Sequence, residues 1–149
     1  MTTNVRGYVS AAIMALGLIS IGVSAAPLIT PKEAKLPDAG GSLNTRGISR
    51  GPAIKVVSPE TGASTSGPFE FKVDFEPRGG ATIDKSSIKV IYMKSPVVDL
   101  TPRIKSALTD NGFDLKNAEI PPGEHQIKIT VKDSDGRETS TTTTLIGAK

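Results

Sequence analysis

Two stretches of this chain alternate strictly between apolar and polar residues. Residues 69–75 read Phe-Glu-Phe-Lys-Val-Asp-Phe, and residues 125–132 read His-Gln-Ile-Lys-Ile-Thr-Val-Lys. Successive side chains of a β-strand point to opposite faces of a sheet, so a period of two predicts a strand with one buried and one solvated face. The alternation favours an all-β fold in which two antiparallel sheets pack as a β-sandwich.

Further strands are expected between segments rich in Gly, Pro, Asn and Asp, at 53–58, 87–94, 113–120 and 137–146. In 87–94, Ile88, Val90 and Tyr92 are expected to face the core, while Ile91 and Met93 face the other way. That strand is therefore predicted to be partly covered on both faces.

Three local features connect these strands. Residues 83–87 predict a tight turn in which Asp84 caps backbone amides. Residues 133–136, Asp-Ser-Asp-Gly, predict a hairpin turn with Gly136 at positive φ. Residues 102–109 predict a short helix that crosses between the sheets, with Thr101 as its cap. An irregular strand over 97–104 is the alternative.

The N-terminus has the order of a secretory signal. One positive residue, Arg6, precedes an uncharged and mostly apolar run from Tyr8 to Val23. The segment Val23-Ser24-Ala25 then places small residues where a signal peptidase reads them. We expect cleavage after Ala25, which makes residues 1–25 a signal peptide and places the product in the periplasm or outside the cell. An uncleaved anchor is the alternative, although 16 apolar residues are short against the ~20 that span a bilayer.

The rest of the chain divides into two parts. Residues 26–51 are rich in Pro and Gly and show no period, so they are interpreted as a flexible leader or linker. Residues 52–147 carry all the predicted strands and are expected to form one sandwich domain.

Composition excludes several classes of function. The chain has no cysteine, which removes disulfides and thiolate chemistry. Its net charge is +3, of which Arg6 contributes one, and its basic residues alternate with acids. A nucleic-acid partner is therefore not expected, since such proteins cluster Lys and Arg on one face. Stable membrane insertion after signal cleavage is not expected either.

No catalytic constellation accompanies the strands, so neither enzyme activity nor a cofactor is expected. The single histidine, His125, begins an alternating strand and is expected at an exposed or rim position, without the partners of a catalytic triad or a metal centre. Asp133 and Asp135 are candidate calcium ligands. Ordinary hairpin chemistry is the alternative, because calcium needs six or more oxygens.

Three segments together resemble small bacterial immunoglobulin-like domains of the exported or fibronectin-like kind. They are Val57 through Gly62, Gly80 through Val90, and Pro122 through Arg137, the last with a Pro-Gly turn, an alternating strand and a hairpin turn. The resemblance implies an antiparallel sandwich of about seven strands and a binding or spacer role. It brings no catalytic residues, and the cysteine pair and tryptophan of antibody domains are missing.

The expected function is that of an exported, non-catalytic module of the bacterial cell envelope that contacts a protein partner. The edge of the Thr-rich last strand is one candidate surface, because a sheet edge can take up a strand from another chain. The alternatives are a periplasmic module that binds copper, calcium or another ion, and an ancillary domain of a larger periplasmic enzyme.

Overall fold

The computed structural model describes residues 27–40 and 49–149. The predicted signal peptide, 1–25, lies outside the described residues, as do residues 41–48. Within the described part of the chain, no helix is long and apolar enough to cross a membrane.

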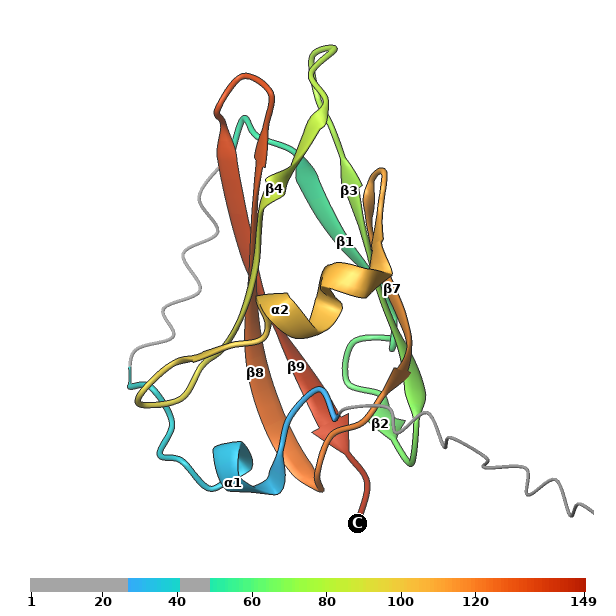
Figure 1. Cartoon of the computed structure of the whole chain (residues 1–149), viewed down its shortest axis with the longest axis vertical. Helices are drawn as coiled ribbons and strands as arrows, with labels where there is room; N and C mark the ends of the chain where they lie inside the picture. Colours follow the sequence, from blue (N-terminus) through green and yellow to red (C-terminus); the bar gives the residue numbers. More distant parts are fainter. Residues whose placement is uncertain (1–26, 41–48) are drawn as a thin grey trace, which may run out of the picture.

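Two sheets pack face to face and form a mostly β sandwich, which confirms the predicted fold class (Figure 1). One sheet has the order β1-β3-β7-β6 and the other the order β2-β9-β8-β4-β5. All strand pairs are antiparallel except β2 with β9. The strands are β1 (Ala53–Ser58), β2 (Ser64–Thr65), β3 (Phe69–Glu76), β4 (Ile83–Tyr92), β5 (Val98–Asp99), β6 (Leu108–Thr109), β7 (Gly112–Ala118), β8 (Gly123–Asp133) and β9 (Glu138–Gly147).

The alternating stretches become β3 and β8, with their apolar residues turned inward as predicted. Phe71 of β3 meets Phe113 of β7 edge to face, with ring centroids 5.2 Å apart. The opposite layer of the core comes mainly from β4 and β8, with Leu145 from β9. Its members in β4 and β8 include Ile88, Val90, Tyr92, Ile127, Ile129 and Val131. The hairpin between β8 and β9 turns at Gly136, whose φ of 76° is the positive value that the sequence predicts.

The predicted tight turn at 83–87 is instead an irregularity inside β4. Asp84 pairs with Lys132 and Lys89 pairs with Thr130, so the four β4 positions 85–88 lie opposite a single β8 residue, Val131. Asp84 does cap a backbone amide, because its Oδ1 accepts a hydrogen bond from the N–H of Ser86 at 3.0 Å. This bulge pushes 85–88 away from the regular sheet, which matters for the pocket described below.

The predicted crossover helix is present but shorter and tighter than expected. It consists of α2 (Thr101–Ile104) followed by the 3-10 turn η1 (Lys105–Ala107), and it carries the chain from β5 in one sheet to β6 in the other. Ile104 anchors it in the core. Thr101 does not cap the helix. Its hydroxyl oxygen accepts the backbone N–H of Val90 at 3.0 Å and so ties the helix to β4.

The interpretation of 26–51 as a flexible leader needs correction for residues 27–40, which we call the strap. Leu28 and Ile29 are fully buried and belong to the same core as the strands, and the N–H of Ile29 donates to the carbonyl of Glu119. After them comes α1 (Pro31–Ala34), whose Thr30 and Glu33 form a capping box. The strap is therefore part of the folded body.

Two ion pairs hold the strap in place. Arg103 of α2 makes a two-point contact with Glu33, at 2.6 and 2.9 Å, and also donates to the carbonyl of Leu28 at 2.6 Å. Further along, the buried Lys94 binds Asp38, and its ammonium lies 5.4 Å from the centre of the Tyr92 ring. The hydrogen bond that the Lys94 ammonium donates to Asp38 is the main reason that the pKa of Lys94 is raised, while burial acts to lower it.

Candidate functional site

His125 is buried, which contradicts the expected exposed or rim position. Its Nε2 lies 2.7 Å from the carbonyl oxygen of Pro121, and its Nδ1 lies 2.8 Å from the hydroxyl of Tyr92. A carbonyl can only accept, so Nε2 carries the proton, and in the neutral ring Nδ1 accepts from Tyr92. Burial raises the pKa of Tyr92, which keeps its hydroxyl protonated as the donor. The pair thus satisfies two buried polar groups by internal hydrogen bonds.

The candidate calcium ligands, Asp133 and Asp135, both contact the guanidinium group of Arg137. The distances are 2.9 Å from Nε to Asp133 and 2.7 Å from Nη2 to Asp135. The other oxygen of Asp133 accepts the backbone N–H groups of Asp135 and Arg137. Burial alone would raise the pKa of Asp133, but these N–H groups and the guanidinium together hold it below its ordinary value. The geometry is that of a closed hairpin.

Among the described residues, no three His, Cys, Asp or Glu side chains are placed so that they could share a metal ion. Asp133 and Asp135 are therefore not joined by a third such side chain in that part of the chain.

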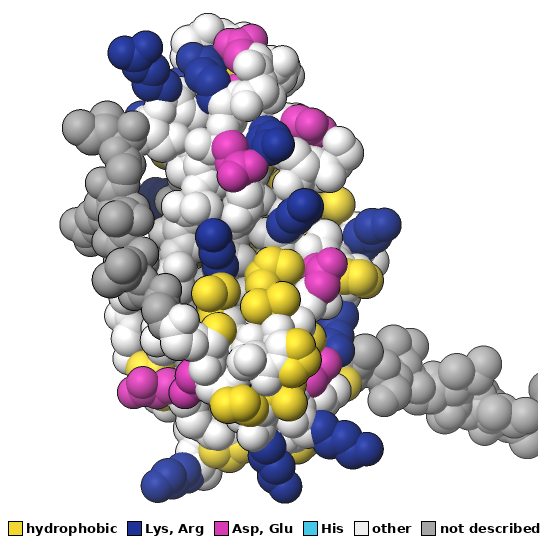
Figure 2. All heavy atoms as spheres, turned by 90° about the vertical axis from the view of Figure 1, so that its left-hand side faces the viewer, with side chains coloured by type: hydrophobic (Ala, Val, Ile, Leu, Met, Phe, Trp, Pro, Cys, Tyr) yellow, Lys and Arg dark blue, Asp and Glu magenta, His cyan; other side chains and the backbone are white. Residues whose placement is uncertain are grey.

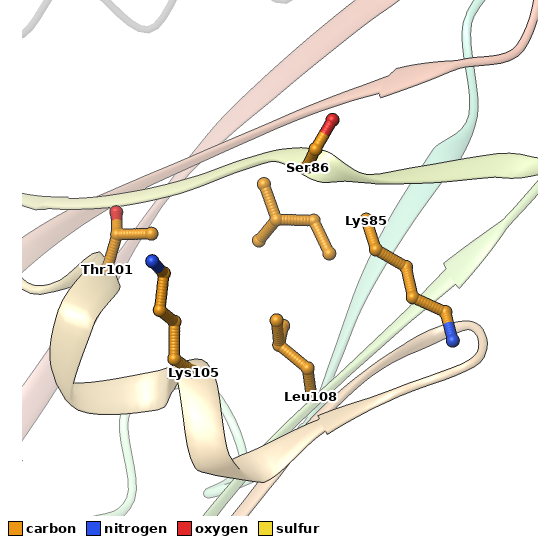
Figure 3. A pocket seen from close by; sticks show the side chains of 6 residues that line it. Lys85, Ser86, Thr101, Lys105 and Leu108 are labelled. Atoms are coloured by element: carbon orange, nitrogen blue, oxygen red, sulfur yellow. The ribbon is translucent and has the colours of Figure 1, made fainter.

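A pocket opens between the two sheets on the side of the crossover. One wall is the bulge of β4, and the other is the crossover together with β6 (Figure 3). Its volume is about 440 Å³. The lining residues are Lys85, Ser86, Ile88, Thr101, Lys105 and Leu108.

The pocket joins an apolar floor to a polar rim. Ile88 and Leu108 supply apolar surface from the two facing sheets. Lys85 is turned toward the hairpin between β6 and β7, where its ammonium binds Asp110 at 2.6 Å (Figure 3). That hydrogen bond lowers the pKa of Asp110. Lys105, in contrast, makes no ion pair with any carboxylate among the described residues, and its side chain extends from η1 toward the side of Thr101.

A second feature lies on the outer face of the five-stranded sheet. Figure 2 shows hydrophobic side chains gathered on this side of the molecule, with Lys and Arg side chains around them. We define the outer patch as Ile91, Met93 and Val97. The first two are half-buried, as expected for a strand covered in part on both faces, and Val97 is 60% exposed.

The sequence alone predicts neither the pocket nor the outer patch as a site. The pocket forms between a bulge and a helical turn that lie at least 13 residues apart in the sequence. No local sequence pattern predicts that these two segments are neighbours in the fold. The outer patch was visible in part, because Ile91 and Met93 are out of phase with the inward residues of the same strand. Comparison with family models, curated proteins and solved structures gives no match.

Proposed function

We propose that this chain is an exported, non-catalytic immunoglobulin-like module of the bacterial cell envelope that works by contacting another protein. The observation that carries the proposal is the outer patch, in which Val97 is 60% exposed and Ile91 and Met93 are half-buried. The one histidine and the two hairpin aspartates, in contrast, are engaged in internal contacts. Exposed apolar patches on otherwise polar domains mark surfaces that bind partners.

The strand order supports the immunoglobulin-like part of the proposal. In such domains one sheet has strands A, B, E and D in that order, and the other has G, F and C. Here β1-β3-β7-β6 corresponds to A-B-E-D, and β9-β8-β4 corresponds to G-F-C. The hairpins β6–β7 and β8–β9 occupy the places of D–E and F–G. The two short strands β2 and β5 extend the second sheet at its two edges.

Export rests on the N-terminal sequence. The test is the intact mass of the protein recovered from the periplasm of a bacterial host that expresses the full chain. We expect a product that begins at Ala26. A product that retains residues 1–25 and stays with the membrane fraction would instead support the anchor.

The protein contact is tested by capture from periplasmic extract with a tagged form that begins at Ala26. The variant Val97→Asp places a charge in the outer patch, and Val57→Asp is the matched control. Val57 is the other large apolar side chain that is exposed in the described part of the chain. It is 38% exposed and lies on β1, in the opposite sheet. We expect one partner that is retained by the chain and by Val57→Asp and lost with Val97→Asp. Equal recovery with both variants would refute the outer patch as the contact.

A further inference from the structure

We propose that the pocket between β4 and the crossover binds a small amphiphilic anion, a molecule with one carboxylate-like head and a short apolar body. This site is separate from the outer patch, and the inference goes beyond the proposed protein contact.

The construction of the pocket argues for a ligand of this size. The bulge takes residues 85–88 out of register with β8. The hydrogen bond from the Val90 N–H to the Thr101 hydroxyl fixes the position of the crossover relative to β4. The space that remains, about 440 Å³, lies within the roughly 300–1,000 Å³ of pockets that hold small molecules. The walls are the bulge of β4, the strand β6 and the helical turn, which all belong to the folded body, so the shape is formed before a ligand arrives.

The charge of the rim argues for an anionic head. None of the six lining residues is acidic, and two are lysines. The charge of Lys85 is balanced by Asp110, while Lys105 has no such partner among the described carboxylates. The hydroxyl of Thr101 accepts from the Val90 N–H and donates to the carboxylate of Asp99. An oxyanion at this end of the pocket therefore receives its charged hydrogen bond from the ammonium of Lys105.

The floor argues for an apolar body behind that head. Ile88 is 3% exposed and Leu108 is half-buried, and both belong to the pocket lining. An alkyl chain laid over this floor removes from water its own apolar surface and that of Leu108, while Ile88 closes the floor from below. A cation is disfavoured by the Lys105 ammonium, and a head without charge forfeits the stronger, charge-assisted bond.

The test is a titration of the form that begins at Ala26, followed by NMR, with decanoate as the probe below its micelle concentration. Acetate lacks the apolar body, decanol lacks the charge, and decyltrimethylammonium reverses it. We expect decanoate to shift the amide signals of Ile88, Thr101, Lys105 and Leu108. It should also bind at least about tenfold more tightly than each control probe. Decanol and decyltrimethylammonium cannot accept the charge-assisted hydrogen bond, and acetate has no apolar body to bury.

Substitutions at exposed lysines separate the site from general charge. Lys105→Gln should weaken decanoate binding about tenfold, and Lys105→Glu should reverse the preference in favour of decyltrimethylammonium. Lys89→Gln makes the same change of charge on the outward face of β4 and should leave the affinity unaltered. The proposal would be overturned if decanoate did not bind, or if the anionic and cationic probes bound equally well. It would also be overturned if the shifts occurred at the outer patch instead of the pocket, or if Lys105→Gln and Lys89→Gln had equal effects.

Discussion

Glu33 connects a single ionisable side chain to the stability of the whole domain. The hydrogen bonds from Arg103 are the main reason that its pKa falls from 4.5 to about 2, and the N–H and hydroxyl of Thr30 act in the same direction. A carboxyl whose pKa is lower in the folded than in the unfolded chain contributes stability above its unfolded pKa and loses it as the pH falls through the folded pKa. The contribution of Glu33 is therefore complete above about pH 5 and disappears toward pH 2.

We expect Glu33→Gln to remove this part of the acid sensitivity. Urea unfolding at pH 6 and at pH 2.5 should show that the unsubstituted chain loses about 1–2 kcal/mol more than the variant between the two values, after allowance for solvent screening of a pair near the surface. The comparison between the two chains cancels the other carboxyls that titrate in this range. Identical losses in both would show that the pair with Arg103 contributes nothing to folding.

Phe71 tests the face assignment of β3. Its side chain is completely buried and packs edge to face on Phe113, so Phe71→Ala leaves a cavity and should cost about 3–5 kcal/mol. That is a large part of the roughly 5–15 kcal/mol that holds a domain together, and we expect little soluble protein in the periplasm. The neighbouring Glu70→Ala, on the solvated face, should accumulate normally. A Phe71→Ala chain as stable as this control would contradict the assignment.

The same alternation shows where residue-level prediction succeeded and failed. The inward positions of β3 and β4 follow directly from a period of two. His125 has the same phase as Ile127 and Ile129, so the period itself predicts an inward side chain, and its polar character led to the opposite expectation. The ring can be buried because both of its nitrogens have hydrogen-bond partners. One partner, Tyr92, is distant in sequence, and the other, Pro121, lies just outside the strand.

At the scale of elements, the strap is the part that the sequence period could not predict. Residues 27–40 contain only one turn of helix and two adjacent buried residues, and neither produces a repeating pattern. A local signal was nevertheless present, since Thr30, Pro31 and Glu33 have the spacing of a capping box with Pro in the first turn. The long strands, in contrast, were predictable because the buried faces of 69–76 and 123–133 extend over several residues.

Removal of the strap is expected to damage the sandwich. A chain that begins at residue 41 loses Leu28 and Ile29 from the core and leaves Arg103 and Lys94 without their partners in the strap. The point variant Leu28→Ala should cost about 2–5 kcal/mol by cavity formation, and Lys32→Ala, exposed on α1, should be neutral. Thermal or urea unfolding of the three variants measures this. A truncated chain as stable as the longer form would restore the interpretation of the strap as a leader.

At the scale of the whole molecule, strap, crossover and both sheets contribute to one continuous core without any disulfide. Leu28, Ile104, Phe71 and Ile127 come from four different parts of the chain and belong to the same buried cluster. The chain has no cysteine, so this cluster and the hydrogen bonds around it are what resist unfolding. A domain built in this way is expected to unfold in a single cooperative step that includes the strap.

Hydrogen exchange on the form that begins at Ala26 tests that cooperativity. The N–H of Ile29 donates to the carbonyl of Glu119, so its exchange reports whether the strap is docked. If the strap opens only when the core does, this amide and those of β8 should exchange with the same free energy of opening, and urea should lower both in parallel. The exposed amide of Glu60, in the turn after β1, is the fast reference. The Ile29 amide could instead exchange with a much lower free energy of opening than the amides of β8. That result would show that the strap detaches from the sandwich while the core stays folded.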